Sequence, residues 1–90
     1  MRKTSFETPF QLSFTSMNIA AILDAAGFYV EVLRQAASKR CVFYVDDVKA
    51  VRDLIGLYHS GDVVPVSGKR LLASRSVIHQ RCLRALMEAI

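Results

Sequence analysis

The chain has 90 residues, of which 52% are hydrophobic and 22% are charged. A chain of this length forms one domain at most, and this composition is too apolar for intrinsic disorder. The formal net charge is +4. The whole excess lies in residues 63–90, because the charges of residues 1–62 sum to zero. The composition therefore indicates a small packed domain with one local basic surface.

The ends of the chain and its two cysteines exclude several classes of protein. The longest segment without a charge, residues 8–23, contains many polar side chains, whereas a membrane-spanning helix needs about 20 mostly apolar residues. Glu7 and these polar residues also interrupt the apolar run of a signal peptide. We therefore expect a cytoplasmic protein without a membrane segment. Cys41 and Cys82 provide no disulfide framework and are expected to be small buried hydrophobes.

The first elements follow a short N-terminus, residues 1–9, that we expect to be flexible or dependent on a partner. Residues 10–14 alternate apolar and polar side chains, which is the period-two pattern of a half-buried strand. Apolar residues then recur at helical spacing, with Thr15 and Ser16 as natural N-caps and Gly27 as a C-terminal stop. This pattern predicts a helix over about 17–26.

A β-hairpin is predicted next. Two runs of β-branched and aromatic residues, 28–33 and 41–45, are separated by small and polar residues that suit a loop. In the second run Cys41, Phe43 and Val45 share one face. We expect that face to join the core and the opposite face to leave two tyrosines near water.

A second helix is predicted after the hairpin. Asp46 and Asp47 offer N-cap oxygens and favourable charge at its start. It is expected to end near Tyr58 to Ser60, with Gly61 as its stop. Pro65 excludes a helix from the segment that follows.

The last helix is predicted over about 69–89, opened by Ser67 and Gly68. Three arginines, Arg70, Arg81 and Arg84, fall on the side opposite its apolar stripe. The stripe comprises Leu71, Ile78, Cys82, Ala85, Leu86 and Ala89, flanked by Leu72, Leu83 and Ile90. Together the elements predict an α+β fold: a short antiparallel β-hairpin or three-stranded sheet packed by three helices in a single small domain.

Three segments carry a resemblance to a known family. They are N-I-A-A-I-L-D-A-A-G-F at 18–28, C-V-F-Y-V-D-D at 41–47 and V-R-D-L-I-G-L-Y-H-S-G at 51–61. In this order, and over about residues 12–87, the chain resembles a family of short bacterial and phage-borne domains known only as a domain of unknown function. The resemblance implies an α+β domain associated with bacterial genomes and mobile elements. It brings no catalytic residue to this chain.

The sequence shows no signature of a catalytic, cofactor or metal site. The segment V-S-G-K-R at 66–70 departs from a phosphate-binding P-loop, because six residues separate Gly61 from Gly68 and Arg70 replaces the hydroxyl that would hold magnesium. The two histidines and two cysteines share no ligand spacing. We expect no catalytic residue, no cofactor and no metal.

Arg75 and His79 form an i, i+4 pair inside or beside the apolar arc of the last helix. An arginine in such a position usually pairs with a carboxylate or extends along its own methylenes. Asp46, Asp47 and Asp53 are the candidate partners. A contact with another protein is the alternative, so both residues are candidate interface positions.

The basic residues Lys69, Arg70, Arg81 and Arg84 are candidates for contact with nucleic-acid phosphates or with an acidic partner. A solvated helix face is the alternative, because surface helices commonly carry arginines and Glu88 shares this face.

Tyr29 and Tyr44 lie on neighbouring predicted strands. Exposed aromatic residues can stack nucleic-acid bases, but Glu31 between them would repel phosphate. We therefore expect a dimer contact or packing under the last helix there, with Leu33 and Val42 as further candidate interface residues.

The expected function is that of a small non-enzymatic accessory domain that self-associates or binds an unidentified protein partner. An apolar fraction slightly above that of an average protein supports this expectation. Val77 and Met87 are further apolar residues that we expect a partner to cover. Nucleic-acid binding through the basic face of the last helix is the alternative.

Overall fold

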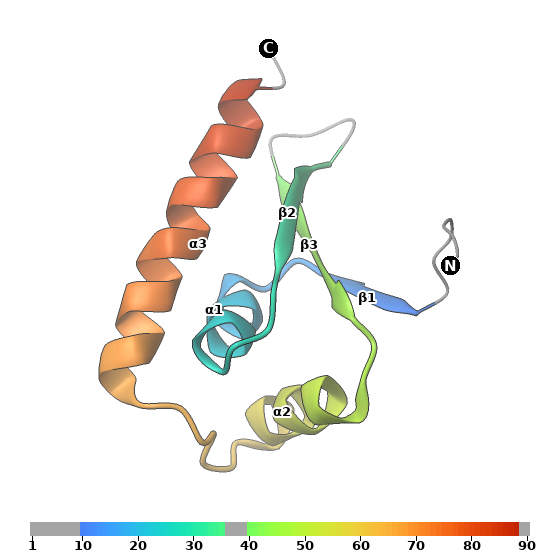
Figure 1. Ribbon diagram of the computed structural model, residues 1–90, viewed down its shortest axis with the longest axis vertical. Helices are drawn as coiled ribbons and strands as arrows, with labels where there is room; N and C mark the ends of the chain where they lie inside the picture. Colours follow the sequence, from blue (N-terminus) through green and yellow to red (C-terminus); the bar gives the residue numbers. More distant parts are fainter. Residues whose placement is uncertain (1–9, 36–39, 89–90) are drawn as a thin grey trace.

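The computed structural model describes residues 10–35 and 40–88. The elements follow the chain as β1 (Gln11–Phe14), α1 (Met17–Ala25), β2 (Glu31–Arg34), β3 (Cys41–Asp46), α2 (Lys49–Ser60) and α3 (Gly68–Glu88). Three helices and a three-stranded antiparallel sheet form a small α+β domain, which confirms the predicted fold class (Figure 1). The predicted N-terminus at 1–9 and the end of the last helix, Ala89 and Ile90, lie outside the described residues.

The sheet is built around β3, because the strand order is β1-β3-β2 and both outer strands pair antiparallel with it. Phe43 of β3 lies between Phe14 of β1 and Val32 of β2. The rings of Phe14 and Phe43 are 5.7 Å apart between centroids. Phe43 and Val45 are buried and Cys41 is half-buried, so the face predicted for the core is the face that packs inward.

The helices complete the core on one side of the sheet. α3 packs against α1 and β2, and α2 packs against α1, so that α1 lies in the middle of the molecule (Figure 1). The core joins side chains from α1, the strands, α2 and α3: Ile19, Ala20, Leu23, Val30, Phe43, Val45, Val51, Leu54, Ile78 and Cys82.

The strand predicted at 28–33 begins later than expected, at Glu31. The delay follows from the end of α1, where the Gly27 and Phe28 amides donate to the carbonyls of Asp24 and Leu23, each at 3.0 Å. This is the pattern of a Schellman cap, with Gly27 at a φ of 101°. Phe28 is therefore still tied to α1, and pairing with β3 begins only three residues later.

The start of α2 also differs from the prediction. Its N-cap is Val48, which makes no side-chain cap, whereas Asp46 and Asp47 were the expected caps. Asp46 remains in the β1–β3 ladder opposite Gln11, and the Asp47 amide donates to the carbonyl of Phe10. These strand contacts delay the helix. Its predicted stop is confirmed, because Gly61 is left-handed with a φ of 79°.

The start of α3 agrees with the prediction to within one residue. The Ser67 hydroxyl accepts the Arg70 amide at 3.1 Å, and the Ser67 carbonyl accepts the Leu71 amide at 2.9 Å. Ser67 therefore caps the helix as the sequence indicated.

Candidate functional site

Helix α3 carries most of the candidate residues, and only one narrow side of it is buried. Ser74, Ile78 and Cys82 are buried against the rest of the domain. They are spaced four residues apart, so they form a single line along the helix. Figure 1 shows α3 at the edge of the molecule, with the other elements on one side of it.

A second apolar line on α3 faces outward; we call it the exposed stripe and define it as Leu72, Leu83 and Met87. Their exposed fractions are 72%, 47% and 71%. At 100° per residue the three side chains fall within about 60° of one another. Leu72 and Leu83 were expected to flank the buried stripe, and this expectation is wrong because α3 contacts its neighbours along too narrow a line to cover them.

The candidate interface residues of the hairpin do not all meet. Leu33 pairs directly with Val42, and Tyr44 lies two residues further along β3 on the same face. Leu33 is exposed, while Val42 and Tyr44 are half-buried. Tyr29 is exposed but lies before β2, in the connection from α1. The structure thus groups Leu33, Val42 and Tyr44 and leaves Tyr29 apart.

Arg75 and His79 are both exposed on α3. The Arg75 Nε donates to the Asn18 side-chain oxygen at 3.3 Å, and the Asn18 amide donates to the Tyr58 hydroxyl at 3.3 Å. Arg75 therefore links α3 to α1 through an amide, not through one of the predicted carboxylates.

Two of those carboxylates have basic neighbours of their own. Asp53 pairs with Lys49 at 2.8 Å, and Asp47 lies 3.5 Å from the Arg52 guanidinium. The Asp47 Oδ1 forms no hydrogen bond although it is buried, so its contact with Arg52 is purely ionic. These two predicted partners of Arg75 therefore pair with basic residues of α2 instead.

Arg81 is held by the protein itself. Its guanidinium lies 3.9 Å from the Asp24 carboxylate, donates to the Val30 carbonyl at 3.4 Å and lies 5.9 Å from the centre of the Tyr29 ring. It thereby connects α3 with α1 and with the segment before β2. Among the described residues no ion pair is recorded for the other predicted basic contacts, Lys69, Arg70 and Arg84, which are exposed.

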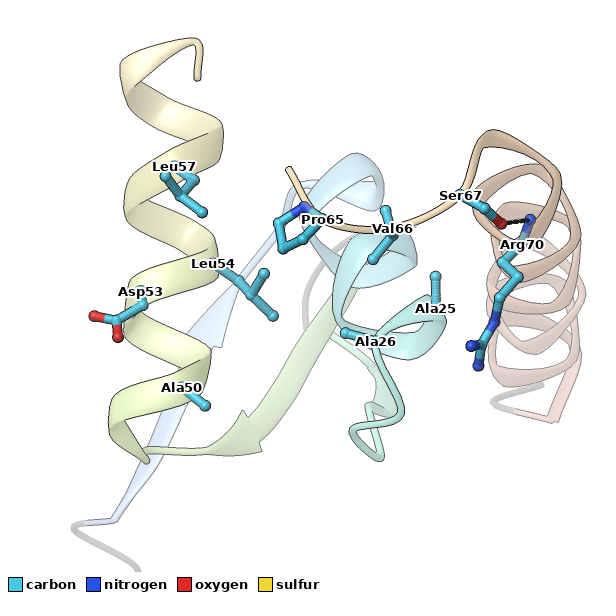
Figure 2. Close-up of a pocket in the computed structure, with 10 residues that line it drawn as sticks. All are labelled: Ala25, Ala26, Ala50, Asp53, Leu54, Leu57, Pro65, Val66, Ser67 and Arg70. Atoms are coloured by element: carbon cyan, nitrogen blue, oxygen red, sulfur yellow. Dashed lines mark hydrogen bonds between the residues drawn. The ribbon is translucent and has the colours of Figure 1, made fainter. Parts of the chain in front are cut away.

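A groove of about 580 Å³ crosses the C-terminal end of α1 between α2 and α3 (Figure 2). Its charged groups, Asp53 and Arg70, stand on opposite walls, and Figure 2 shows the Asp53 carboxylate directed away from Arg70. The Ser67 hydroxyl is engaged as the cap of α3. Small and apolar side chains form the rest of the lining, so the polar groups do not converge on one point.

A second groove, of about 410 Å³, lies between α3 and β3 and includes both cysteines and His79. The Cys41 thiol donates to the Cys82 carbonyl at 3.6 Å. Burial raises the pKa of Cys82 to about 11, with smaller contributions from the charge of the neighbouring Cys41 and a hydrogen bond with its thiol. The sequence predicted core-facing positions for both cysteines. It did not predict their contact with each other, because this contact depends on how α3 packs against β3.

Within residues 10–35 and 40–88, no cluster of three or more His, Cys, Asp or Glu side chains is placed to hold a metal ion. The helices of these residues do not combine the length and apolar character needed to cross a membrane. Comparison of the chain with protein-family models, curated proteins and solved structures finds no match. The resemblance to short bacterial and phage-borne domains stays a prediction.

Replacing Arg81 tests its structural role. We expect Arg81→Ala to lower the free energy of unfolding by about 1 kcal/mol, because the bond to the Val30 carbonyl and the contact with Asp24 are lost. Arg84→Ala, three residues along the same exposed side, is the control and should change stability by less than about 0.5 kcal/mol. Urea unfolding followed by circular dichroism measures both, and equal effects would contradict the assignment.

The raised pKa of Cys82 predicts a loss of stability in alkali. The folded chain holds the thiol proton more tightly than the unfolded chain, so this contribution is complete below about pH 9 and is lost as the pH approaches 11. The loss should be on the order of 2 kcal/mol. Urea unfolding with a reductant present measures it, and Cys82→Ala should show a correspondingly shallower decline between pH 8.5 and 11. Parallel pH profiles for the two proteins would contradict it.

Proposed function

We propose that this chain is a small, non-enzymatic protein-interaction domain that forms a homodimer through the exposed stripe of α3. The observation that carries the proposal is the exposure of Leu72 and Met87, at 72% and 71%, with the partly exposed Leu83 between them. Exposed large apolar side chains aligned on one face of a helix are candidates for an interaction site. Over fifteen residues the stripe spans about 22 Å of helix, which is long enough for a helix–helix contact.

A second copy of the chain is the occupant that the spacing favours. Leu72 and Met87 lie equally far on either side of a point between His79 and Gln80, and so do Ser76 and Leu83. A two-fold axis through that point therefore sets Leu72 against Met87 of the second copy, and Leu83 against the small Ser76. This self-complementarity is what an isologous dimer requires. The resulting pair of α3 helices is antiparallel.

The basic residues determine how the dimer should respond to salt. Arg70 and Arg84 lie about 60° or more from the edge of the stripe on the helix wheel, so they border the contact without entering its centre. Both α3 helices have an excess of positive charge. Screening by salt should therefore leave the dimer intact or strengthen it.

Light scattering after gel filtration, over a concentration series, tests the dimer. We expect wild-type protein to dimerise, and Leu72→Glu combined with Met87→Glu to weaken the dimer at least tenfold, because four carboxylates would enter one apolar contact. The matched control is Val77→Glu, which also places a carboxylate on the exposed part of α3 but outside the stripe. A wild-type monomer at all concentrations, or equal effects of the stripe and control variants, would overturn the proposal.

Nucleic-acid binding remains the second proposal, favoured by the exposure of Lys69, Arg70 and Arg84 without a recorded ion pair in the described residues. Phosphate contacts by these side chains would release counterions, so the affinity would fall steeply with salt. This is the opposite of the salt response of the dimer.

A salt series of binding to DNA and RNA separates the two functions. Combining Arg70→Ala with Arg84→Ala should make the slope of log affinity against log salt shallower by about 2, one for each lost phosphate contact. The variant that combines Leu72→Glu with Met87→Glu is the control. It shows whether nucleic-acid binding depends on dimerisation. Failure of the wild-type protein to bind at low salt would contradict nucleic-acid binding and would leave the dimer unaffected.

A further inference from the structure

Cys41 and Cys82 are 41 residues apart in the sequence and meet in the folded chain, where the first residue of β3 faces α3. The Cys41 thiol lies 3.6 Å from the Cys82 carbonyl oxygen, so the two cysteines are in direct contact. Both cysteines are free. Two thiols in such contact are the reactants of an intramolecular disulfide.

The two thiols differ in access. Cys41 is half-buried, whereas Cys82 is only 7% exposed. Both line the groove between α3 and β3, together with His79 and Leu83 of α3. A small reagent that enters this groove therefore reaches Cys41 before it reaches Cys82.

We propose that Cys41 and Cys82 form a redox-active dithiol, in which Cys41 attacks a small-molecule disulfide such as oxidised glutathione and Cys82 resolves the product. This property is separate from self-association, because neither cysteine belongs to the exposed stripe.

The reaction consists of two exchanges. Cys41 loses its proton to solvent and its sulfur attacks one sulfur of the reagent, which forms a mixed disulfide and releases one thiolate. The released thiolate takes a proton from solvent. The Cys82 thiol then loses its proton to solvent, and its sulfur attacks the Cys41 sulfur. The second half of the reagent leaves with the electrons of the broken bond and is protonated from solvent. Two protein thiols are thereby oxidised to one disulfide, and one reagent disulfide is reduced to two thiols.

The protonated state of Cys82 sets the rate of the second exchange. Only the thiolate attacks, and burial raises the pKa of the Cys82 thiol above its ordinary value. The mixed disulfide at Cys41 should therefore accumulate near neutral pH. Its closure should accelerate about tenfold for each unit of pH, as the thiolate fraction of Cys82 rises.

The disulfide would join α3 to the central strand of the sheet. Closing a loop between residues 41 positions apart restricts the unfolded chain, which stabilises the folded state. We expect the melting temperature to rise by about 10 °C on oxidation.

Intact-mass spectrometry after exposure of the whole chain to oxidised glutathione tests the proposal. Wild-type protein should pass through a species with one glutathione and end with a mass lower by two hydrogens, without a covalent dimer. Cys82→Ser should stop at the glutathione adduct. Cys41→Ser should react at least tenfold more slowly than Cys82→Ser, because its remaining thiol is buried.

The unfolded chain in urea is the matched control, since both cysteines are then equally accessible and both serine variants should react at the same rate. Three results would overturn the proposal: wild-type protein that keeps two free thiols, wild-type protein that forms only covalent dimers, or native serine variants that react equally fast. The wild-type mass decides the outcome even if one serine variant fails to fold.

Discussion

The arrangement of this domain depends on α1, a nine-residue helix that is buried on nearly every side. Three of its buried residues are alanines, Ala20, Ala21 and Ala25, whose small side chains allow neighbouring helices to approach closely. α3 and α2 both pack against it, and Ile19 and Leu23 join the core beneath the sheet. A helix whose apolar residues are buried on most of its sides belongs in an interior. α1 therefore forms the centre that the other elements surround.

The position of α1 explains the exposure of α3. A sheet of three short strands offers limited area, and part of the space beside it is filled by α1. α3 must therefore pack against α1 and β2 together, along the line of Ser74, Ile78 and Cys82. A 21-residue helix held along one line leaves its remaining sides to solvent. The exposed stripe and the basic residues are both consequences of this edge position.

Local patterns in the sequence were sufficient to predict the elements and the fold class. Alternation identified the inward face of β3, and Gly27 and Gly61 marked the ends of two helices because both need a positive φ. The start of β2 was shifted by three residues and the N-cap of α2 by one or two, since Phe28 remains bonded to α1 and Asp46 to β1. A boundary set by such a tertiary contact has no local signal.

The same limit applies to the candidate site. Spacing on one helix placed Arg81 beside Arg84 as a free basic residue, but its role is decided by Asp24 and by the Val30 carbonyl. Arg75 was expected to pair with a carboxylate or to extend along its own methylenes, and its guanidinium instead donates to Asn18. The contact of Cys41 with Cys82 likewise joins two elements whose relative position the sequence does not state. The sequence did not show which residues of α3 face outward, because this depends on the side of the helix that packs against the rest of the domain.

The charges at the start of α3 bear on the direction in which two copies would pair. Lys69 and Arg70 occupy the first turn, and no acidic residue is present there. Cations at a helix N-terminus face the positive end of its dipole, which is unfavourable by about 0.3 to 1 kcal/mol each. In an antiparallel pair the same cations lie beside the C-terminal carbonyls of the second helix, where positive charge is stabilising. A parallel pair would instead set the two basic ends side by side, so the charges and the apolar spacing select the same antiparallel orientation.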